Sequence, residues 1–303
     1  MRGRSLTRFA SGLVSLLLFA WCAGGETHSG GGPVRPGAAR GVAPAGSLQD
    51  GVFESLEQAL RSPERVRRLV LQSEDPRMRR LPPGLGAMIN LEALEMSCLE
   101  NLRELPEEIG GLRKLQELII DNGNGCSMNV TLPRSLGRLE NLRVLRLYGA
   151  LDAREVGAGG PTRAPRGKAL PASLADLRRL EELDLGRNGI RSLPPQVASL
   201  RRLKKLGLDY NDIRELPSFV GGLTRLEELS LNSNGGVALP QSLAALKGLR
   251  LFMGNNRLTL REQQRLRARF PHAVFSFENE FDDDAANEQP RGPRARPRRG
   301  RTR

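Results

Sequence analysis

The sequence predicts an α/β solenoid, in which short parallel strands stack side by side and the return segments close over a shared core. Three observations lead to this fold class. A pattern of spaced leucines, an asparagine and a Leu-Pro pair recurs about every 23 residues between residues 66 and 260. Each copy alternates apolar and polar residues, as a strand with one buried face requires. Only 4% of the residues are aromatic, so leucine must fill most of the core.

The clearest copy of the repeat spans residues 180–194. Leu183 and Leu185 give the alternation of a half-buried strand. Asn188 can turn inward and hydrogen-bond the backbone of the turn, and Leu193-Pro194 is expected to end regular structure. One repeat cannot cover its own apolar face, so about eight copies must stack on one another. The other copies share the same strand positions, which are Val66/Leu69/Leu71, Leu91/Leu94/Met96, Leu115/Leu118/Ile120, Leu142/Leu145/Leu147, Leu203/Leu206/Leu208, Leu226/Leu229/Leu231 and Leu251/Met253.

These residues resemble the leucine-rich repeat family, in the 23-residue variety that reads LxxLxLxxNxLxxLPxxLxxL. Within that family the chain is similar to exported bacterial leucine-rich repeat proteins and lipoproteins. The resemblance implies a right-handed, curved leucine-rich repeat solenoid with a parallel sheet on its concave face. It also implies protein or glycan partners, without naming them.

The N-terminus is expected to be a signal peptide over residues 1–22, because three arginines precede the short apolar run at 13–21. That run is too short to span a bilayer as a helix. The sequence at Cys22 resembles the lipobox of bacterial lipoproteins, in which a lipidated cysteine becomes the new N-terminus. Trp21 stands where that family has Gly or Ala. Lipidation of Cys22 and ordinary cleavage nearby both remain open, and either predicts a secreted or lipid-anchored protein at the cell envelope.

Three further segments follow the signal peptide. Residues 23–48 are rich in Gly, Ala and Pro and are expected to be a flexible tether. Residues 49–278 are expected to form the leucine-rich repeat domain with its caps. Residues 279–303 are first acidic and then Arg-rich, with too few apolar residues to fold, so a disordered tail is expected.

Both ends of the repeat array need a cap to cover the open core. Ser55 and Gln58 have the spacing of a capping box, and the apolar residues from Phe53 to Leu60 predict a short amphipathic helix ahead of the first strand. After the last repeat, residues 262–270 predict a helix and residues 273–277 a final strand. Bacterial leucine-rich repeat proteins that the chain resembles often end in this way.

Two cysteines follow adjacent strands and are expected at the same edge of the sheet. An exported chain meets an oxidising environment, so Cys98 and Cys126 are predicted to form a disulfide, with two free thiols as the alternative. The longest repeat contains an insert at residues 151–168, rich in Gly, Ala, Pro and Arg. The insert is expected to be a surface loop, either functional or neutral.

Charge and composition exclude several functions. The net charge is +13, of which residues 1–48 carry +4 and residues 279–303 carry +2, leaving +7 for the predicted domain. No concentrated basic patch is interleaved with aromatic residues, which argues against nucleic acid as a partner. Two histidines and three scattered cysteines give no paired metal-ligand motif. The sequence also contains no nucleophile elbow and no phosphate-binding loop, so we expect no catalysis, no cofactor and no metal.

The leading hypothesis is a non-catalytic exported scaffold that recognises a protein or glycan partner on the concave face. Side chains that lie between or just beyond the buried leucines of a strand must face solvent there. The partner-binding candidates chosen on this basis are Arg146, Tyr148, Glu182, Asp184, Arg187, Lys205, Asp209, Tyr210, Glu228 and Asn232. The alternative is a structural surface protein attached electrostatically to anionic envelope polymers or lipids through its basic edge and Arg-rich tail.

Overall fold

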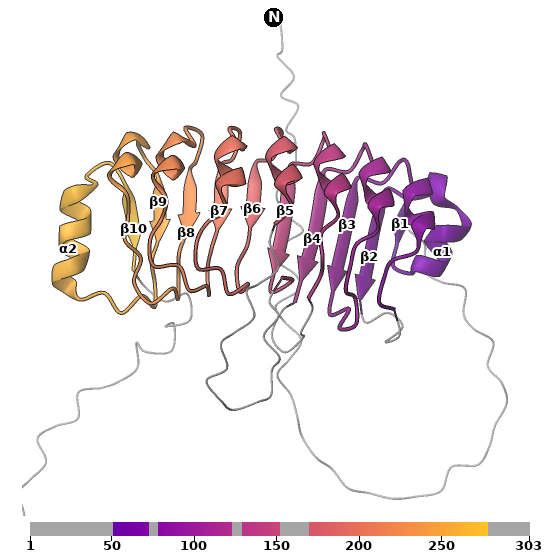
Figure 1. The fold of residues 1–303 in the computed structure, drawn as a ribbon, viewed down its shortest axis with the longest axis horizontal. Helices are drawn as coiled ribbons and strands as arrows, with labels where there is room; N and C mark the ends of the chain where they lie inside the picture. The colour runs from indigo at the N-terminus through magenta and orange to yellow at the C-terminus, as the bar shows by residue number, and fades with distance from the viewer. Residues whose placement is uncertain (1–50, 73–77, 123–128, 152–169, 278–303) are drawn as a thin grey trace, which may run out of the picture. The chain divides into compact units, whose positions relative to one another are not determined.

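The computed structural model describes residues 51–72, 78–122, 129–151 and 170–277. Within them, ten strands form one sheet in chain order, and every neighbouring pair is parallel. The α/β solenoid predicted from the repeats is therefore confirmed (Figure 1). The strands are β1 (Val52–Phe53), β2 (Arg68–Gln72), β3 (Ala93–Ser97), β4 (Glu117–Asp121), β5 (Val144–Tyr148), β6 (Glu182–Asp184), β7 (Lys205–Gly207), β8 (Glu228–Ser230), β9 (Arg250–Phe252) and β10 (Val274–Ser276).

The register of the sheet follows the repeat pattern. One buried apolar residue of each strand lies opposite its counterpart in the next strand, and the whole column is withdrawn from solvent. This column predominantly contains leucine, which fills the core as the composition predicts. Its members are Phe53, Leu69, Leu94, Leu118, Leu145, Leu183, Leu206, Leu229, Leu251 and Phe275.

Short 3-10 helices form the return segments after the Leu-Pro pairs, so the expectation that regular structure ends there is wrong. The proline of each pair is the N-cap residue of the turn, with an extended ψ between 142° and 158°, and its carbonyl oxygen accepts the first hydrogen bond of the turn. The turn needs no N–H group from its N-cap residue, so the missing N–H of proline costs nothing there. Most of these turns place an apolar side chain in the core, as Val197 and Val220 do. The turns after Leu-Pro pairs are η2 (Pro83–Ala87), η3 (Glu107–Gly111), η4 (Arg134–Arg138), η5 (Ala172–Asp176), η6 (Pro195–Ser199), η7 (Ser218–Gly222) and η8 (Gln241–Ala245), and one more 3-10 turn, η1 (Pro63–Arg65), precedes the first such pair.

A ladder of buried asparagines joins the repeats from β6 to β9. The side-chain oxygen of Asn211 accepts hydrogen bonds from the backbone N–H groups of Asn188 and Ile190, both at 3.0 Å. Its amide group donates to the carbonyl oxygens of Leu185 and Leu208, also at 3.0 Å. The inward turn predicted for the repeat asparagine is confirmed. The other members of this asparagine ladder are Asn188, Asn234 and Asn256.

The N-terminal end begins with a strand that the sequence analysis did not predict. β1 precedes helix α1 (Leu56–Arg61), and Phe53 pairs with Leu69 of β2, so Phe53 is not part of the helix. Ser55 is the N-cap residue, but its side chain caps no backbone N–H group, and the capping box predicted there is wrong. The helix is held instead by its buried residues, Leu56 and Ala59.

Helix α2 (Leu260–Arg269) and β10 close the opposite end of the sheet, and the predicted helix and strand cap is confirmed (Figure 1). A capping box starts α2. The N–H group of Thr259 donates to the Glu262 carboxylate at 2.8 Å, and the N–H group of Glu262 donates to Thr259 Oγ1 at 3.3 Å. Phe270 is only 2% exposed, and its ring centre lies 6.5 Å from that of Phe275 in β10.

Several predictions fall on segments outside the described residues. These segments are the signal peptide at 1–22 with Cys22, the tether at 23–48, the insert beyond its first residue Leu151, and the tail at 279–303. Among the residues that are described, no helix is long and apolar enough to cross a membrane. The same part of the chain contains no group of three or more side chains suited to holding a metal ion.

Candidate functional site

The candidate site is the middle of the sheet, on the side that points away from the leucine core. Buried and solvent-accessible residues alternate along each strand, so the positions flanking the buried column form this surface. We call the part from β4 to β7 the central sheet face. It consists of Glu117, Ile119, Asp121, Val144, Arg146, Tyr148, Glu182, Asp184, Gly186, Lys205, Gly207 and Asp209.

The structure places the ten predicted partner-binding residues on or beside this face, and none of them is buried. Those in strands are Arg146, Tyr148, Glu182, Asp184, Lys205 and Glu228. Those in the turns that leave the sheet are Arg187, Asp209, Tyr210 and Asn232. A binding surface requires this solvent access, and the role of these residues in binding stays a prediction.

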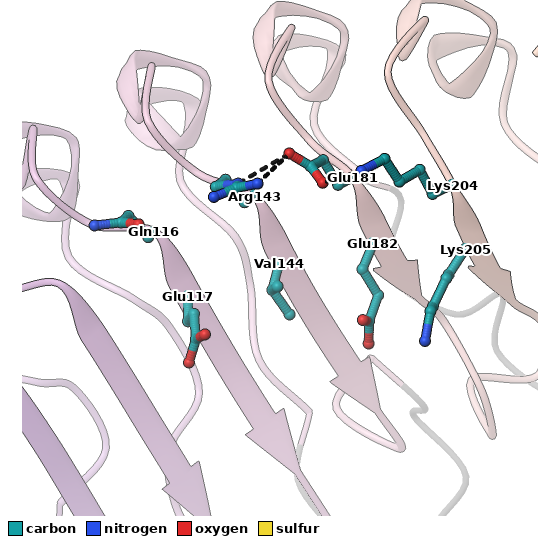
Figure 2. A pocket seen from close by; sticks show the side chains of 8 residues that line it. All are labelled: Gln116, Glu117, Arg143, Val144, Glu181, Glu182, Lys204 and Lys205. Atoms are coloured by element: carbon teal, nitrogen blue, oxygen red, sulfur yellow. Dashed lines mark hydrogen bonds and ion pairs between the residues drawn. The ribbon is translucent and has the colours of Figure 1, made fainter. Parts of the chain in front are cut away.

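A hollow of about 220 Å³ lies over the start of β4 to β7 (Figure 2). Val144 occupies the middle of one row of side chains, between Glu117 on β4 and Glu182 on β6. Valine is shorter than either glutamate, so the row is lowest at Val144. The hollow therefore has an apolar floor with a carboxylate on each side.

The upper row of the hollow is held by a chain of ion pairs. Arg143 donates to the Glu181 carboxylate from Nε at 2.9 Å and from Nη2 at 2.6 Å, and Lys204 Nζ donates to the same carboxylate at 2.8 Å (Figure 2). The hydrogen bonds from Lys204 and Arg143 lower the pKa of Glu181. Solvent-exposed pairs contribute little stability, of the order of 0–1 kcal/mol each. Their effect here is to fix the positions of long side chains across three strands.

Two glycines allow an aromatic ring and a carboxylate to lie flat on the neighbouring strand. A Cβ atom added at Gly186 would lie 2.7 Å from two ring carbons of Tyr148. A Cβ atom added at Gly207 would lie 2.7 Å from an Asp184 carboxylate oxygen. At either glycine a larger residue would force the facing side chain to move, so these glycines shape the surface. The sequence analysis missed them, because their contacts appear only when the repeats are placed in register.

The carboxylates of Asp184 and Asp209 are partly withdrawn from water. Burial raises the pKa of both groups, and the negative charge of Asp184 raises that of Asp209 further. Neutral donors oppose the shifts. The N–H group of Gly186 donates to Asp184 at 2.8 Å, and Ser230 Oγ and the N–H group of Asn232 donate to Asp209 at 2.6 and 2.7 Å. Burial likewise raises the pKa of Tyr148.

The two tyrosines occupy different positions in their repeats. Tyr148 is the last residue of β5, and its counterpart beyond β7 is Asp209. Tyr210 comes one residue later, in a left-handed turn with φ of 54°, and is 41% exposed. Gly149 and Arg187 adopt the same left-handed backbone in their own repeats. Tyr210 therefore projects from the rim of the face, whereas Tyr148 lies on its surface.

Cys98 forms a disulfide in the structure. Its predicted partner, Cys126, lies outside the described residues, so the Cys98–Cys126 pairing stays a prediction. Cys98 directly follows β3 and has a left-handed φ of 52°.

Comparison with known proteins supports the repeat assignment. Residues 162–269 match the family model described as a leucine-rich repeat region. The repeats within residues 162–269 are leucine-rich repeats. A curated relative, the uridine 5'-monophosphate transferase of Xanthomonas campestris pv. campestris, is 31% identical over 104 residues, covering 32% of this chain and 19% of that protein. This chain thus spans about a fifth of the length of that relative.

The fold of this chain is also similar to that of three solved structures. A leucine-rich repeat protein of Leptospira interrogans is 24% identical, with a TM-score of 0.45, covering 75% of this chain and 64% of that one. An internalin of Listeria monocytogenes is 19% identical, with a TM-score of 0.48, covering 73% and 66%. A plant peptide hormone receptor in complex with RGF2 is 22% identical, with a TM-score of 0.43, covering 72% and 36%.

Proposed function

We propose that this chain is a non-catalytic binding scaffold that recognises a protein partner on the central sheet face after export. The observation that carries the proposal is the placement of Tyr148 and Tyr210 beside the half-buried carboxylates of Asp184 and Asp209. Tyrosine combines a large contact area with a polar tip and is enriched at binding hot spots. The asparagine ladder and the ion pairs fix these groups before a partner arrives, which lowers the entropy cost of binding.

The double substitution Tyr148→Ala and Tyr210→Ala tests the site. We expect it to weaken binding of the native partner, isolated by affinity capture from the source organism, by tenfold or more, or roughly 1.4 kcal/mol. Val274→Ala is the matched control, because Val274 is 60% exposed on β10 of the same sheet and its loss also removes apolar surface. Partner binding that is unchanged in the double variant, as in the control, would rule out the central sheet face.

The export step rests on the N-terminal sequence, in which a charged segment precedes a leucine-rich apolar run. We expect the mature protein to lack residues 1–21 or 1–22. Mass spectrometry of the mature N-terminus checks this, and a diacylglyceryl group on Cys22 would distinguish lipid anchoring from secretion. An intact Met1 on protein recovered from the cytoplasm would contradict export.

A second candidate function is electrostatic attachment to anionic envelope polymers or lipids. It is favoured by exposed arginines at the edge where the chain enters the sheet, namely Arg178, Arg179, Arg201, Arg202 and Arg225. Attachment of this kind should fade steeply as salt rises, because exposed charges are screened. Binding that survives high salt and depends on Tyr148 favours the central sheet face instead.

A further inference from the structure

We propose that the central sheet face binds the chain's own arginine-rich C-terminal segment, residues 289–303, and that a partner must displace this segment. The inference rests on the proposed function, because it concerns the same surface. It assigns that surface a ligand of defined chemistry, a peptide carrying several guanidinium groups. Three observations support it.

The first observation is the charge of the surface. The predicted domain carries +7, but the central sheet face has the opposite sign. Its bases are Arg146 and Lys205, and its acids are Glu117, Asp121, Glu182, Asp184 and Asp209, which gives the face a net charge of −3. Arg187 at the rim leaves it at −2. Both bases are paired: Arg146 with Glu182 of the face itself, and Lys205 with Glu228 of β8. The acids Glu117, Asp184 and Asp209 make no ion pair with either base. A cationic ligand therefore meets an excess of acids.

The second observation is the shape of the surface. The methylene stem of an arginine can pack on Val144 in the hollow, while its head group reaches the carboxylate of Glu117 on β4. On the other side of Val144, Glu182 is already paired with Arg146, and the hollow is also lined by Lys204 and Lys205, so Glu117 is the acid that the hollow offers to the ligand. Further along the face, the ring of Tyr148 lies beside Asp184. An aromatic ring next to a carboxylate suits a guanidinium group, which can stack on the ring and pair with the acid.

The third observation is the sequence and reach of the tail. Residues 289–303 contain seven arginines and no acid. All strands are parallel, so the chain leaves β10 at Phe277, on the edge of the sheet where Asp209 follows β7. β7 and β10 are three strand spacings apart, roughly 14 Å. Residues 278–290 can span up to about 43 Å when extended, so the tail can reach the face.

Tethering favours this occupant over a free peptide. A short linker gives the tail an effective concentration in the millimolar range at the face. Even weak pairing of the arginines with Asp184 and Asp209 then keeps the face occupied. A partner that binds there competes with the tail. The partner must therefore bind the face more strongly than the tethered tail does.

A competition experiment on the full mature chain tests the proposal. The probe is a fluorescein-labelled synthetic peptide of residues 289–303, and binding is followed by fluorescence anisotropy at fixed salt. The comparison chain has a neutral tail, in which Arg291, Arg294, Arg296, Arg298, Arg299, Arg301 and Arg303 are each replaced by Gln. We expect the neutral-tail chain to bind the probe at least tenfold more tightly than the unchanged chain, because its face is free.

Substitutions on the face show whether the probe binds there. In the neutral-tail chain, the pair Asp184→Asn and Asp209→Asn should weaken probe binding at least tenfold, since Asn keeps the shape and removes the charge. The pair Glu104→Gln and Glu140→Gln removes the same charge from ion-paired sites off the face and should change binding by no more than about twofold. Equal weakening by both pairs would mean nonspecific attraction and would overturn the proposal.

Two other outcomes would reassign the face. Tight probe binding by both the unchanged and the neutral-tail chain would mean that an external basic peptide, and not the tail, is the occupant. Tail-dependent dimers in sedimentation would assign the face to the tail of a second copy. Failure of the proposed function is seen separately, in capture of the native partner by the Tyr148 and Tyr210 variant, which does not depend on the probe.

Discussion

The sheet has two regions that satisfy the backbone of their turns in different ways. In the first region, β2 to β5, every strand has five residues and the pairing continues to the last of them. In the second region, β6 to β9, every strand has three residues and the asparagine ladder fills the turns. Leu99 and Ala150 take the place of the ladder asparagine in two repeats of the first region.

The first region has one buried asparagine of its own, Asn122 just past β4, which donates from Nδ2 to the carbonyl oxygen of Gly149 at 2.7 Å. It also uses asparagine at partly exposed positions. Asn90 and Asn141 lie just before the buried leucine that precedes β3 and β5, and each donates from Nδ2 to a carbonyl oxygen of the preceding repeat at 2.7 Å. The same residue type therefore plays two roles. Inside the turns it replaces water for buried backbone groups, whereas at the edge it competes with water that is already present.

The two regions meet at the candidate site. Asn188, the first member of the asparagine ladder, donates to the carbonyl oxygen of Leu147 at 2.6 Å and accepts from the N–H group of Leu151 at 2.8 Å. Both partners belong to the last repeat of the first region. The central sheet face, which spans β4 to β7, thus lies across this junction and takes strands from both regions.

The largest expected effect is the loss of a ladder asparagine. Asn211→Ala leaves the N–H groups of Asn188 and Ile190 without their acceptor and the carbonyl oxygen of Leu185 without its side-chain donor, whereas the Leu208 carbonyl keeps the amide of Asn234. Each unsatisfied buried group costs about 1–3 kcal/mol, so we expect a loss of roughly 3–5 kcal/mol in the free energy of unfolding. Urea denaturation of the variant and the parent measures it.

Asn141→Ala is the control in the first region, because it removes two exposed hydrogen bonds, one to the carbonyl oxygen of Arg113 at 2.7 Å and one from Arg179 at 2.6 Å. We expect a loss below about 1 kcal/mol, since water can replace the amide. Equal losses for the two variants would show that the regions do not differ in the way proposed.

The disulfide of Cys98 should stabilise the first region and leave the second unchanged. Cys98→Ser removes it, and if Cys126 is the partner, opening a loop of about 28 residues costs roughly 3–4 kcal/mol by the chain-entropy model. Hydrogen exchange should show faster opening of β3 and β4, with β7 to β9 protected as before. Mass spectrometry of a non-reduced digest identifies the partner, and a free Cys126 thiol would contradict the predicted pairing.

Most of the fold could be predicted from the sequence because the repeat period fixes it. Once Leu183 is aligned with Leu206, the register, the buried column and the inward Asn188 follow. The surface was harder to predict, because it depends on contacts between repeats. That Gly186 accommodates the Tyr148 ring is visible only when the strands are paired. For the same reason, side-chain alternation placed Tyr148 and Tyr210 on one surface. It did not show that Tyr148 lies on the central sheet face whereas Tyr210 lies at its rim.

The smallest expected effect compares the two ends of the sheet, where the sequence offers a capping box at each helix and the structure forms only one. Thr259→Ala removes the capping oxygen of α2 and should lower the melting temperature by about 2 °C, given the usual effect of such caps in a domain of this size. Ser55→Ala is the control at α1 and should leave it unchanged, because the Ser55 side chain makes no capping bond.

The capping box should also give the Thr259→Ala effect a defined pH dependence. The hydrogen bonds from Thr259 lower the pKa of Glu262. A carboxyl group with a lowered pKa in the folded state adds stability above its unfolded pKa, about 4.3, and that stability is lost as the pH falls through the folded pKa. The difference in melting temperature between parent and variant should therefore be largest at pH 7 and decrease below pH of about 4. A difference that stays constant down to pH of about 2 would mean that the Glu262 carboxylate takes no part in capping, and that Thr259 stabilises α2 through its own oxygen alone.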